Sequence, residues 1–373
     1  MASEIFRAER IFDGFRWHEN AALIVEEGRV AGISPSDEGQ WLEGAIVPGL
    51  IDLQVNGGGG VLFNNDPSPA GIAQICHAHA GFGTTAVMVT LITDSAEVTA
   101  RAISAGEASR DQAGFLGLHL EGPHLALSRK GTHDPALIRP MSAEDLAVIT
   151  GAAARLPHLI STIAPEAVSQ EQVAALAAAG AVVSLGHSDT DSATALAYMG
   201  AGAQMATHLY NAMSQLGHRS PGLVGAALAC DEIWAGLIAD GFHVDDIAMK
   251  VALAAKEKIF LVSDTMSTIG TDLTGFTLNG RQIYRAGGRL TLADGTLAGA
   301  DIALIDALRY VVTKLGLPLE RGLNLASLHP ARAMGIKDRG HLQIGARADF
   351  FTLSPELTAM KTWIAGQPAG GGQ

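Results

Sequence analysis

Short apolar runs alternate with alanine-rich stretches of helical spacing along most of the chain after Pro48. The runs predict buried strands, and they are AIVPGLIDLQV, TTAVMVTLI, GFLGLHL, LISTIAP, AVVSLGH, GAQMATH, IWAGLIAD and KIFLVSD. The stretches after them predict helices near 68–80, 95–109, 142–153, 168–179, 191–199 and 244–256, with a short helix after the sixth run. Eight such units close a parallel barrel, so we predict the α/β class with a TIM-like (β/α)8 barrel. No GxGxxG turn follows the first run, which disfavours an open doubly wound sheet.

Near the two ends of the chain, apolar and polar residues alternate with the two-residue period of a strand. Residues 1–45 and 340–355 have this pattern. The stretch FTLNGRQIYRAGGRLTLADG predicts hairpins with Asn-Gly and Gly-Gly turns. Two further helices are expected near 301–315 and 319–328. We therefore predict a small β-sandwich domain, made of residues 1–45 and 340–365, beside a barrel of residues 46–339. The tail AGGGQ is expected to be disordered.

Composition narrows the class of protein. Hydrophobic residues make up 48% of the 373 residues and charged residues 17%, as in a globular enzyme. A net charge of −13 without any Lys/Arg block argues against a nucleic-acid partner. No run approaches the ~20 apolar residues of a membrane span, and the charged N-terminus lacks a secretory core, so we expect no membrane partner and a cytoplasmic location. The two cysteines lie far apart without CxxC spacing, so they indicate neither a disulfide framework nor a cysteine zinc site.

Polar residues gather where the predicted strands end, the place where parallel barrels keep their chemistry. Strand interiors are Val, Leu, Ile and Ala, whereas the ends carry Gln54, Asn56, His119, Glu121, Glu166, His187, His208, His243 and Asp264. Glu121, His187 and His208 supply one carboxylate and two imidazoles, the set that a catalytic zinc ion takes while keeping a position open for water. Each alone is more often a hydrogen-bonded loop residue, but together they predict a divalent metal site. Zn²⁺ is the first candidate, and Fe²⁺, Co²⁺ and Mn²⁺ use the same set.

Asp264 follows the eighth strand and is placed to act as a general base toward an activated water, then as a general acid toward a leaving amine. Its alternative role is a turn or helix cap. His77 and His79 have the His-x-His spelling of a metal site, but they lie in a predicted helix, where residues two apart point ~200° away from each other. We interpret both as ordinary helix residues.

Several longer motifs follow one another in order: PGLIDLQVNGGGG, GLHLEGPHL with KGTH, SLGHSDT, ATHLYNAMSQLGHRSPGLVGAAL, DGFHV, LVSDTM and GARADFF. Over nearly its whole length the chain thereby resembles the N-acetylglucosamine-6-phosphate deacetylases of the amidohydrolase superfamily. Many amidohydrolases end their first barrel strand in His-x-His, which binds a second, more buried metal, and this group has Gln-x-Asn instead. The resemblance therefore implies one metal ion per subunit, with Gln54 hydrogen bonding beside the substrate.

The resemblance also assigns roles to further residues, of which His133 and Arg219 would be surface residues on local sequence alone. It implies that His133 polarises the acetyl carbonyl, and that Asn211, Ala212, Arg219 and His243 hold the sugar phosphate. One of these contacts is expected from a neighbouring subunit, because the resemblance implies a homodimer.

The implied reaction is removal of the acetyl group from N-acetylglucosamine 6-phosphate, which gives glucosamine 6-phosphate and acetate. Two alternatives stay open from the sequence. One is an amidohydrolase that acts on a different N-acyl amine or a cyclic amide, and the other is a non-catalytic barrel that serves as a binding scaffold. The complete set of Glu121, His187, His208 and Asp264 argues against the scaffold.

Overall fold

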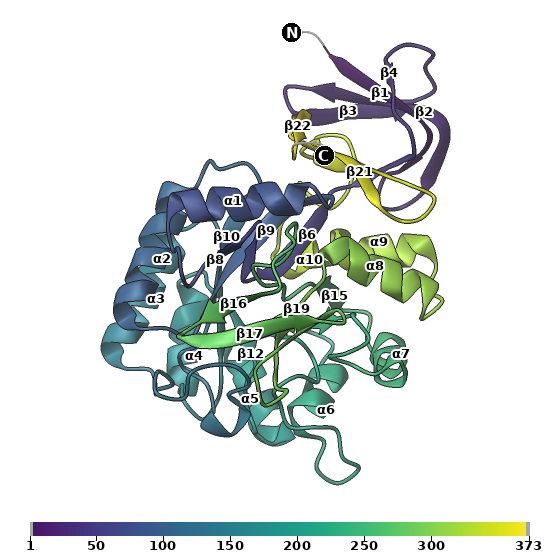
Figure 1. Ribbon diagram of the computed structural model, residues 1–373. Coiled ribbons are helices and arrows are strands. Elements are labelled where there is room, and N and C mark those ends of the chain that lie inside the picture. Colours follow the sequence, from purple (N-terminus) through teal and green to yellow (C-terminus); the bar gives the residue numbers. More distant parts are fainter. Residues whose placement is uncertain (1–2, 371–373) are drawn as a thin grey trace.

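Eight parallel strands form an almost closed barrel, and a separate mixed sheet lies beside it (Figure 1). The computed structural model describes residues 3–370 of the chain. The barrel strands are β6 (Leu50–Val55), β9 (Thr84–Ile92), β10 (Phe115–Glu121), β11 (Leu159–Ile163), β12 (Val182–Leu185), β13 (Ala203–Ala206), β14 (Trp234–Ile238) and β15 (Ile259–Val262). They pair in chain order, and the last meets the first where Asp264 N donates to Gln54 O at 3.0 Å. The predicted TIM-like barrel is confirmed.

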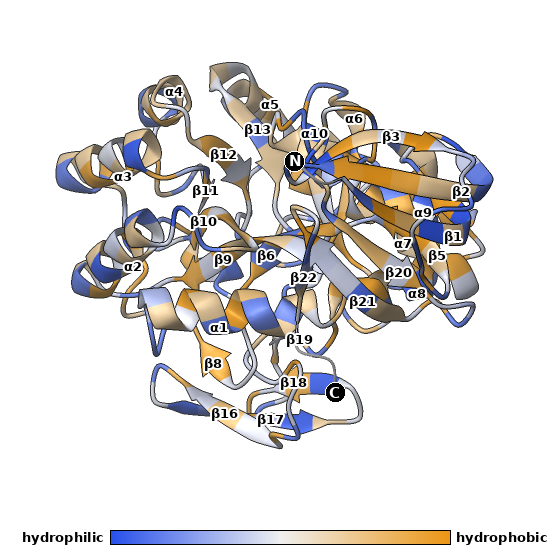
Figure 2. Cartoon of the chain, turned by 90° about the horizontal axis from the view of Figure 1, so that it is seen from above, coloured by the Kyte–Doolittle hydropathy of each residue, from blue (hydrophilic) through white to orange (hydrophobic). Residues whose placement is uncertain are grey.

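Helices cover the outside of the barrel, and each predicted helix lies within three residues of its expected range. They are α1 (Pro69–Ala80), α2 (Ala96–Ala108), α3 (Ala143–Arg155), α4 (Gln170–Ala178), α5 (Ser192–Ala201), α6 (Gly222–Ala229), α7 (Asp246–Ala255), α8 (Leu304–Thr313), α9 (Leu319–Ala326) and α10 (Leu328–Ala333). Serine or aspartate side chains cap most of the barrel helices, as Ser142 does for α3, because they accept the otherwise unpaired first N–H groups. Figure 2 shows the polar turns that α2 and α3 present at the edge of the molecule. The short helix α10 was not predicted. No helix in the described part of the chain is long and apolar enough to cross a membrane.

The barrel interior is a packed apolar core, with Met88, Ile160, Met205 and Phe260 among its buried side chains. The polar side chains of His119, Thr90 and Thr162 also lie within strands, but they hydrogen bond to one another. The chemistry is therefore confined to the two ends of the barrel.

The first and last segments of the chain pair in one sheet, which Figure 1 shows in purple and yellow. Its strands are β1 (Glu4–Phe12), β2 (Trp17–Glu26), β3 (Arg29–Ser34), β4 (Gln40–Trp41), β5 (Ala45–Pro48), β20 (Phe350–Leu353), β21 (Ala359–Ile364) and β22 (Gln367–Ala369). Phe6 of β1 packs on Phe350 and Trp363 with ring centroids 5.1 and 5.7 Å away, so both ends share one core. The proposed domain boundaries at residues 45 and 340 stay a prediction.

One expectation for this region needs correction. Short strands were expected over 340–355, but only β20 falls there; residues 340–349 form turns with a single bridge between Arg347 and Arg29. Gly340 and Gly345 have φ of 77° and 87°, which breaks an extended run. Of the tail expected to be disordered, residues 371–373 lie outside the described range, and Ala369 ends β22.

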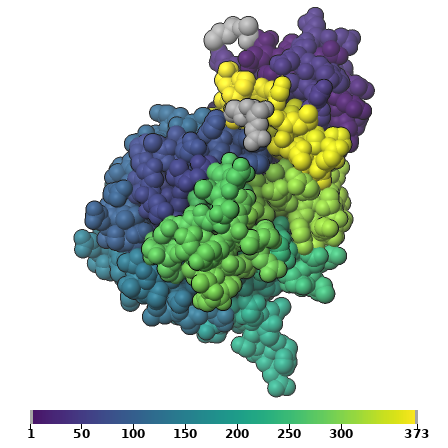
Figure 3. Space-filling view, viewed as in Figure 1, coloured from purple at the N-terminus to yellow at the C-terminus, as the bar shows by residue number. Residues whose placement is uncertain are grey.

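A four-stranded antiparallel unit follows the last barrel strand. Its strands are β16 (Gly275–Leu278), β17 (Arg281–Ala286), β18 (Arg289–Thr291) and β19 (Leu297–Ala300), so the predicted hairpins are confirmed. A shorter hairpin, β7 (Gly57–Gly58) with β8 (Val61–Leu62), follows β6, and a 3-10 turn, η1 (Leu127–Arg129), follows β10. The space-filling view shows the four-stranded unit in green across the face of the barrel (Figure 3). Because this unit leaves the barrel directly after Asp264, it reaches the mouth where the strands end.

Candidate active site

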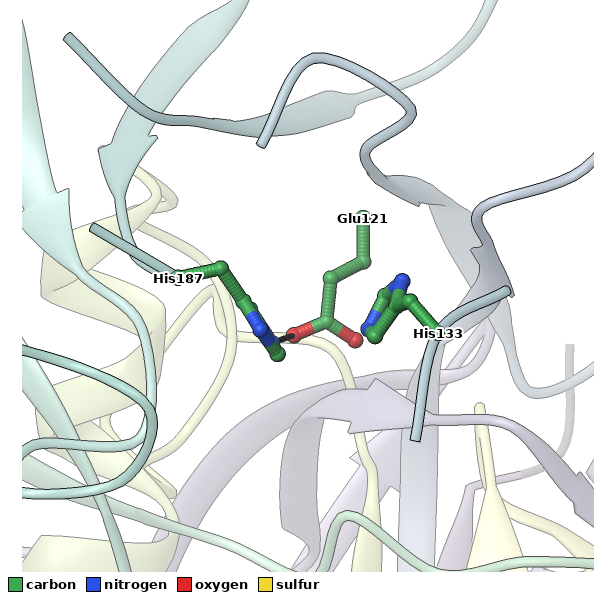
Figure 4. A group of neighbouring side chains, drawn as sticks. All are labelled: Glu121, His133 and His187. Atoms are coloured by element: carbon green, nitrogen blue, oxygen red, sulfur yellow. Dashed lines mark hydrogen bonds and ion pairs between the residues drawn. The ribbon is translucent and has the colours of Figure 1, made fainter. Parts of the chain in front are cut away.

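Glu121, His187 and His208 meet at the C-terminal mouth of the barrel, and all three are buried. Figure 4 shows Glu121 between His187 and His133. His208 Nε2 lies 3.0 Å from Glu121 Oε1, and His187 Nε2 lies 3.2 Å from the same oxygen. The two Nε2 atoms are 3.1 Å apart. Three elements far apart in the sequence thus bring one carboxylate oxygen and two imidazole nitrogens to one point.

The protonation of these rings fits a cation at that point. His187 Nδ1 lies 2.8 Å from the carbonyl oxygen of Arg129, which can only accept, so Nδ1 carries the proton of the neutral ring. The lone pair of His187 Nε2 then faces a carboxylate oxygen, an arrangement that repels unless positive charge lies between them. Separations of 3.0–3.2 Å are also close to the ~3.3 Å between two ligands that sit 2.0–2.1 Å from a tetrahedral ion. The donor set therefore fits a divalent metal.

The charges of the buried groups agree with this reading. Burial alone would raise the pKa of Glu121, but the adjoining imidazoles of His187 and His208 hold it well below its usual value. Burial would lower the pKa of His208, yet its hydrogen bond to Glu121 raises it. The carboxylate thus stays ionised and attracts positive charge into the mouth.

His133 is a fourth member of the cluster, since ligand atoms of Glu121, His133 and His187 lie within 4.8 Å of one another. Its Nδ1 lies 2.7 Å from Thr93 Oγ1 and accepts from Thr93 N at 3.4 Å. We assign the proton to Nε2, because both Thr93 groups can donate to Nδ1. Burial lowers the pKa of His133 well below its usual value, so the ring is neutral. A neutral ring with an Nε2 proton suits a hydrogen-bond donor better than a ligand, and this favours His208 as the third ligand.

Asp264 is held by the two amides that end the first barrel strand. Asn56 Nδ2 donates to Asp264 Oδ1 at 2.8 Å, and Gln54 Nε2 donates to the same oxygen at 3.1 Å. Gln54 Nε2 also lies 3.2 Å from Glu121 Oε1, so one amide spans the two carboxylates. With Oδ1 occupied, Asp264 Oδ2 is left for reactants. The Gln-x-Asn pair therefore orients the candidate base.

The backbone at three of these residues is in the left-handed region that non-glycine residues rarely adopt. φ is 48° at His187, 34° at His208 and 50° at Asp264. Such conformations cost about 1–3 kcal/mol each and persist where the surrounding structure enforces them. At Asp264 the enforcing bonds run from its N to Gln54 O and from Ala300 N to its own carbonyl oxygen. Strain at this mouth is what a preorganised site would show.

A cavity of about 240 Å³ opens at the mouth, and most of the predicted site residues line it. They are Glu121, His133, His187, His208, Asn211, Ala212, His243 and Asp264. His243 Nδ1 is 2.6 Å from Asp240 Oδ2, which fixes the ring. Although burial acts in the opposite direction, that bond holds the pKa of Asp240 below its usual value. His243 Nε2 is thereby left for a ligand.

Two predicted substrate contacts lie outside this cavity. Gln54 is 3% exposed, and its amide hydrogens already bond the two carboxylates. Arg219 is exposed on the loop between β13 and α6, which projects at the lower edge of the molecule (Figures 1 and 3). Substrate contact by either residue stays a prediction.

Sequence reasoning missed several residues of the mouth. Thr93 sets the tautomer of His133, and Asp240 orients His243. Thr296, Leu297 and Gly299 of the four-stranded unit form one wall of the cavity. The sequence signal for this wall of the cavity is that the four-stranded unit follows Asp264 in the chain.

Two further histidines that the sequence pattern singled out, His79 and His119, have structural partners. His79 lies in α1, as predicted, and its buried Nε2 is 3.0 Å from the carbonyl oxygen of Gly57. His119 is buried between Thr90 and Thr162, with its two ring nitrogens 3.2 and 2.7 Å from their hydroxyls. Neither ring nitrogen of His119 faces the cluster.

Comparison with known proteins gives one consistent group. The Amidohydrolase family matches residues 45–369. An N-acetylgalactosamine-6-phosphate deacetylase from Shewanella sp. (strain ANA-3) is 38% identical over 94% of this chain and 91% of its own. An N-acetylglucosamine-6-phosphate deacetylase from Bos taurus is 36% identical over 92% of this chain and 87% of its own.

Solved structures agree with these relatives. The N-acetylglucosamine-6-phosphate deacetylase of Pasteurella multocida has a TM-score of 0.95 and 30% identity, and the match covers 99% of this chain and 100% of that one. A mutant of the Mycobacterium smegmatis enzyme, in complex with N-acetyl-D-glucosamine-6-phosphate, has a TM-score of 0.92 and 27% identity, with both chains fully covered. The chain therefore belongs to the amidohydrolase family, in the group formed by the N-acetylglucosamine-6-phosphate and N-acetylgalactosamine-6-phosphate deacetylases.

Proposed function

We propose that this protein is a metal-dependent hydrolase that removes the acetyl group from N-acetylglucosamine 6-phosphate. The products are glucosamine 6-phosphate and acetate. The observation that carries the proposal is the convergence of Glu121, His187 and His208 with the amide-held Asp264 in one cavity. The sugar-phosphate deacetylases to which the chain is similar support the substrate class.

Glu121, His187 and His208 would hold one divalent ion, with Zn²⁺ as the first choice. When bound, such an ion makes water more acidic and polarises an acyl oxygen. Asp264 then does the proton chemistry. Its Oδ2 takes a proton from the attacking water and later gives it to the departing nitrogen, so that the amine leaves neutral.

His133 lies beside the proposed metal ligands, with its ring centroid 4.4 Å from that of His187. In the assigned tautomer, Nε2–H donates to the oxygen that becomes negative when water attacks the acetyl carbon. A fixed donor aimed at developing charge is typically worth 10²–10³-fold in rate, as a rough guide. Thr93 keeps this donor in place.

Asn211, Ala212 and His243 line the outer part of the proposed substrate site. Arg219 suits a phosphate, because its guanidinium can bind two oxygens at once. Since its loop projects from this subunit, we propose that Arg219 serves the site of a second subunit in a homodimer.

Replacing Arg219 tests the phosphate contact. Arg219→Ala should raise the KM for the phosphorylated sugar about tenfold, with little change for an unphosphorylated amide, because a charged hydrogen-bond pair is worth about 1.5–3 kcal/mol. Arg101→Ala, on the exposed face of α2, is the matched control. Equal effects on both substrates would remove Arg219 from the phosphate site.

The candidate substrates N-acetylglucosamine 6-phosphate and N-acetylgalactosamine 6-phosphate differ only in the configuration at C4, and a kinetic comparison distinguishes them. One relative is named for the galactose form and the other for the glucose form. Steady-state acetate release from both 6-phosphates gives the ratio of kcat/KM. The proposal expects the glucose form to have the higher value. A higher kcat/KM for the galactose form would reassign the substrate while keeping the reaction.

The pH dependence should report Asp264. Burial, reinforced by the charge of Glu121, raises the pKa of Asp264 to about 6. Because the base acts in its ionised form, kcat/KM should fall about tenfold per pH unit below that pKa. A cation beside Asp264 lowers the pKa, so the acid limb belongs at or below about pH 6. A limb centred above pH 7 would contradict this assignment of the base.

A further inference from the structure

A second cavity lies at the opposite end of the barrel from the mouth. Its volume is about 320 Å³, and the residues used below are Arg29, Arg110, His158, Asp338, Arg339 and Arg347, which together define the basal cavity. Leu116, near the start of β10, also lines it, whereas Glu121 ends the same strand at the mouth. Five residues of strand separate the two positions by about 17 Å. The basal cavity is therefore distinct from the candidate active site.

Positive charge is in excess around the basal cavity. Arg339 and Arg347 share one buried carboxylate, that of Asp349, at 3.0 and 2.9 Å. Arg29 lies 3.3 Å from Asp338, and the only other lining carboxylate is that of Glu27. Four guanidinium groups thus face three carboxylates, in a chain whose net charge is −13. Such a local reversal of charge attracts anions.

Arg110 is the residue that a purely structural reading explains least well. Its Nη2 donates to the backbone carbonyl of Arg155, at the end of α3, and it has no carboxylate partner in the described part of the chain. One hydrogen bond uses only one of its five donors. The guanidinium of Arg110 is thus available to a ligand in the basal cavity.

Burial lowers the pKa of two groups that line the basal cavity. For Arg339, Asp349 and Asp338 oppose the effect of burial, whereas Arg347 and Arg29 add to it. Burial also lowers the pKa of His158, and Arg339 lowers it further. An anion in the basal cavity would relieve both effects.

We propose that the basal cavity is a second binding site, which takes the phosphate group of a small metabolite or inorganic phosphate. Guanidinium forks match phosphate oxygens, and a volume of about 320 Å³ is suited to a small polar ligand. The lining comes from the β2–β3 turn, the end of α2 and the loop after α10, so an occupant would bridge the mixed sheet and the barrel. The alternative is an ionic cluster that only joins these two parts.

Calorimetric titration with inorganic phosphate at constant ionic strength tests the proposal. The intact protein should show a binding component that Arg110→Gln and His158→Gln each weaken about tenfold, because each removes one donor to a charged ligand. Arg101→Gln, on α2 shortly before Arg110 but outside the basal cavity, should leave that component unchanged. Phosphate binding that is identical in Arg110→Gln, His158→Gln and the unaltered protein would overturn the proposal.

A parallel titration with glucose 6-phosphate distinguishes the two sources of the phosphate group. If glucose 6-phosphate binds the Arg110-dependent component more tightly than inorganic phosphate does, the site is for a sugar phosphate. Equal affinities assign it to the free ion. If glucose 6-phosphate binds only in a way that Arg110→Gln does not affect, the basal cavity is not a sugar-phosphate site.

Discussion

Asp264→Asn should lower kcat by about 10²–10⁴-fold while the metal content and the KM stay close to those of the unaltered protein. Asparagine has the shape of aspartate, and its Oδ1 can still accept from Gln54 and Asn56. It cannot take a proton from water, nor return one to the departing nitrogen. The loss should therefore fall on turnover, measured as acetate release at saturating substrate.

Asp52→Asn is the matched control for this variant. Asp52 is also buried, lies two residues before Gln54 and accepts from the N–H groups of Gln54 and Ser263 at 3.2 Å. Burial raises its pKa to about 7, so the neutral side chain is already well populated near neutral pH. Near-normal turnover is expected for Asp52→Asn. Normal turnover in Asp264→Asn as well would remove Asp264 from catalysis.

Glu121→Gln should remove the metal together with the activity. The carboxylate is the only negative group among the proposed ligands, and both histidine nitrogens lie within 3.2 Å of its Oε1. Loss of a group beside the ligands already costs 10–100-fold in metal affinity, so we expect the loss of a ligand to cost more than about 100-fold. Elemental analysis after gel filtration should find well below one ion per subunit.

Glu97→Gln, an exposed residue of α2, provides the same chemical change away from the site and should retain the ion. Chelation of the unaltered protein should abolish activity, and adding back Zn²⁺, Fe²⁺, Co²⁺ or Mn²⁺ separately would rank the metals. A Glu121→Gln variant that keeps a full complement of metal would place the ion elsewhere.

Much of this architecture is predictable because the physical causes are local. Apolar runs such as TTAVMVTLI are rich in β-branched residues and are followed by helical stretches, so they indicate buried strands, and the number of units indicates the barrel. Once the barrel is predicted, strand ends become neighbours, so Glu121, His187 and His208 are expected together although 66 and 87 residues separate the histidines from the glutamate.

Other features depend on contacts that sequence spacing does not reveal. The left-handed backbone at His187, His208 and Asp264 is imposed by neighbouring strands and loops. The tautomer of His133 depends on Thr93, and Gln54 turned out to span two carboxylates. Local sequence alone places Arg219 on the surface, where the structure has it, but it does not reveal that the loop lies outside the cavity.

The most direct test of the central claim is acetate release by the metal-loaded protein from N-acetylglucosamine 6-phosphate, with unphosphorylated N-acetylglucosamine measured in parallel. The account predicts rapid release from the phosphorylated sugar, much slower release from the other, and loss of both in Asp264→Asn. If metal-loaded protein releases no acetate from either sugar, the proposed deacetylase activity is contradicted. The substrate would then have to be another amide.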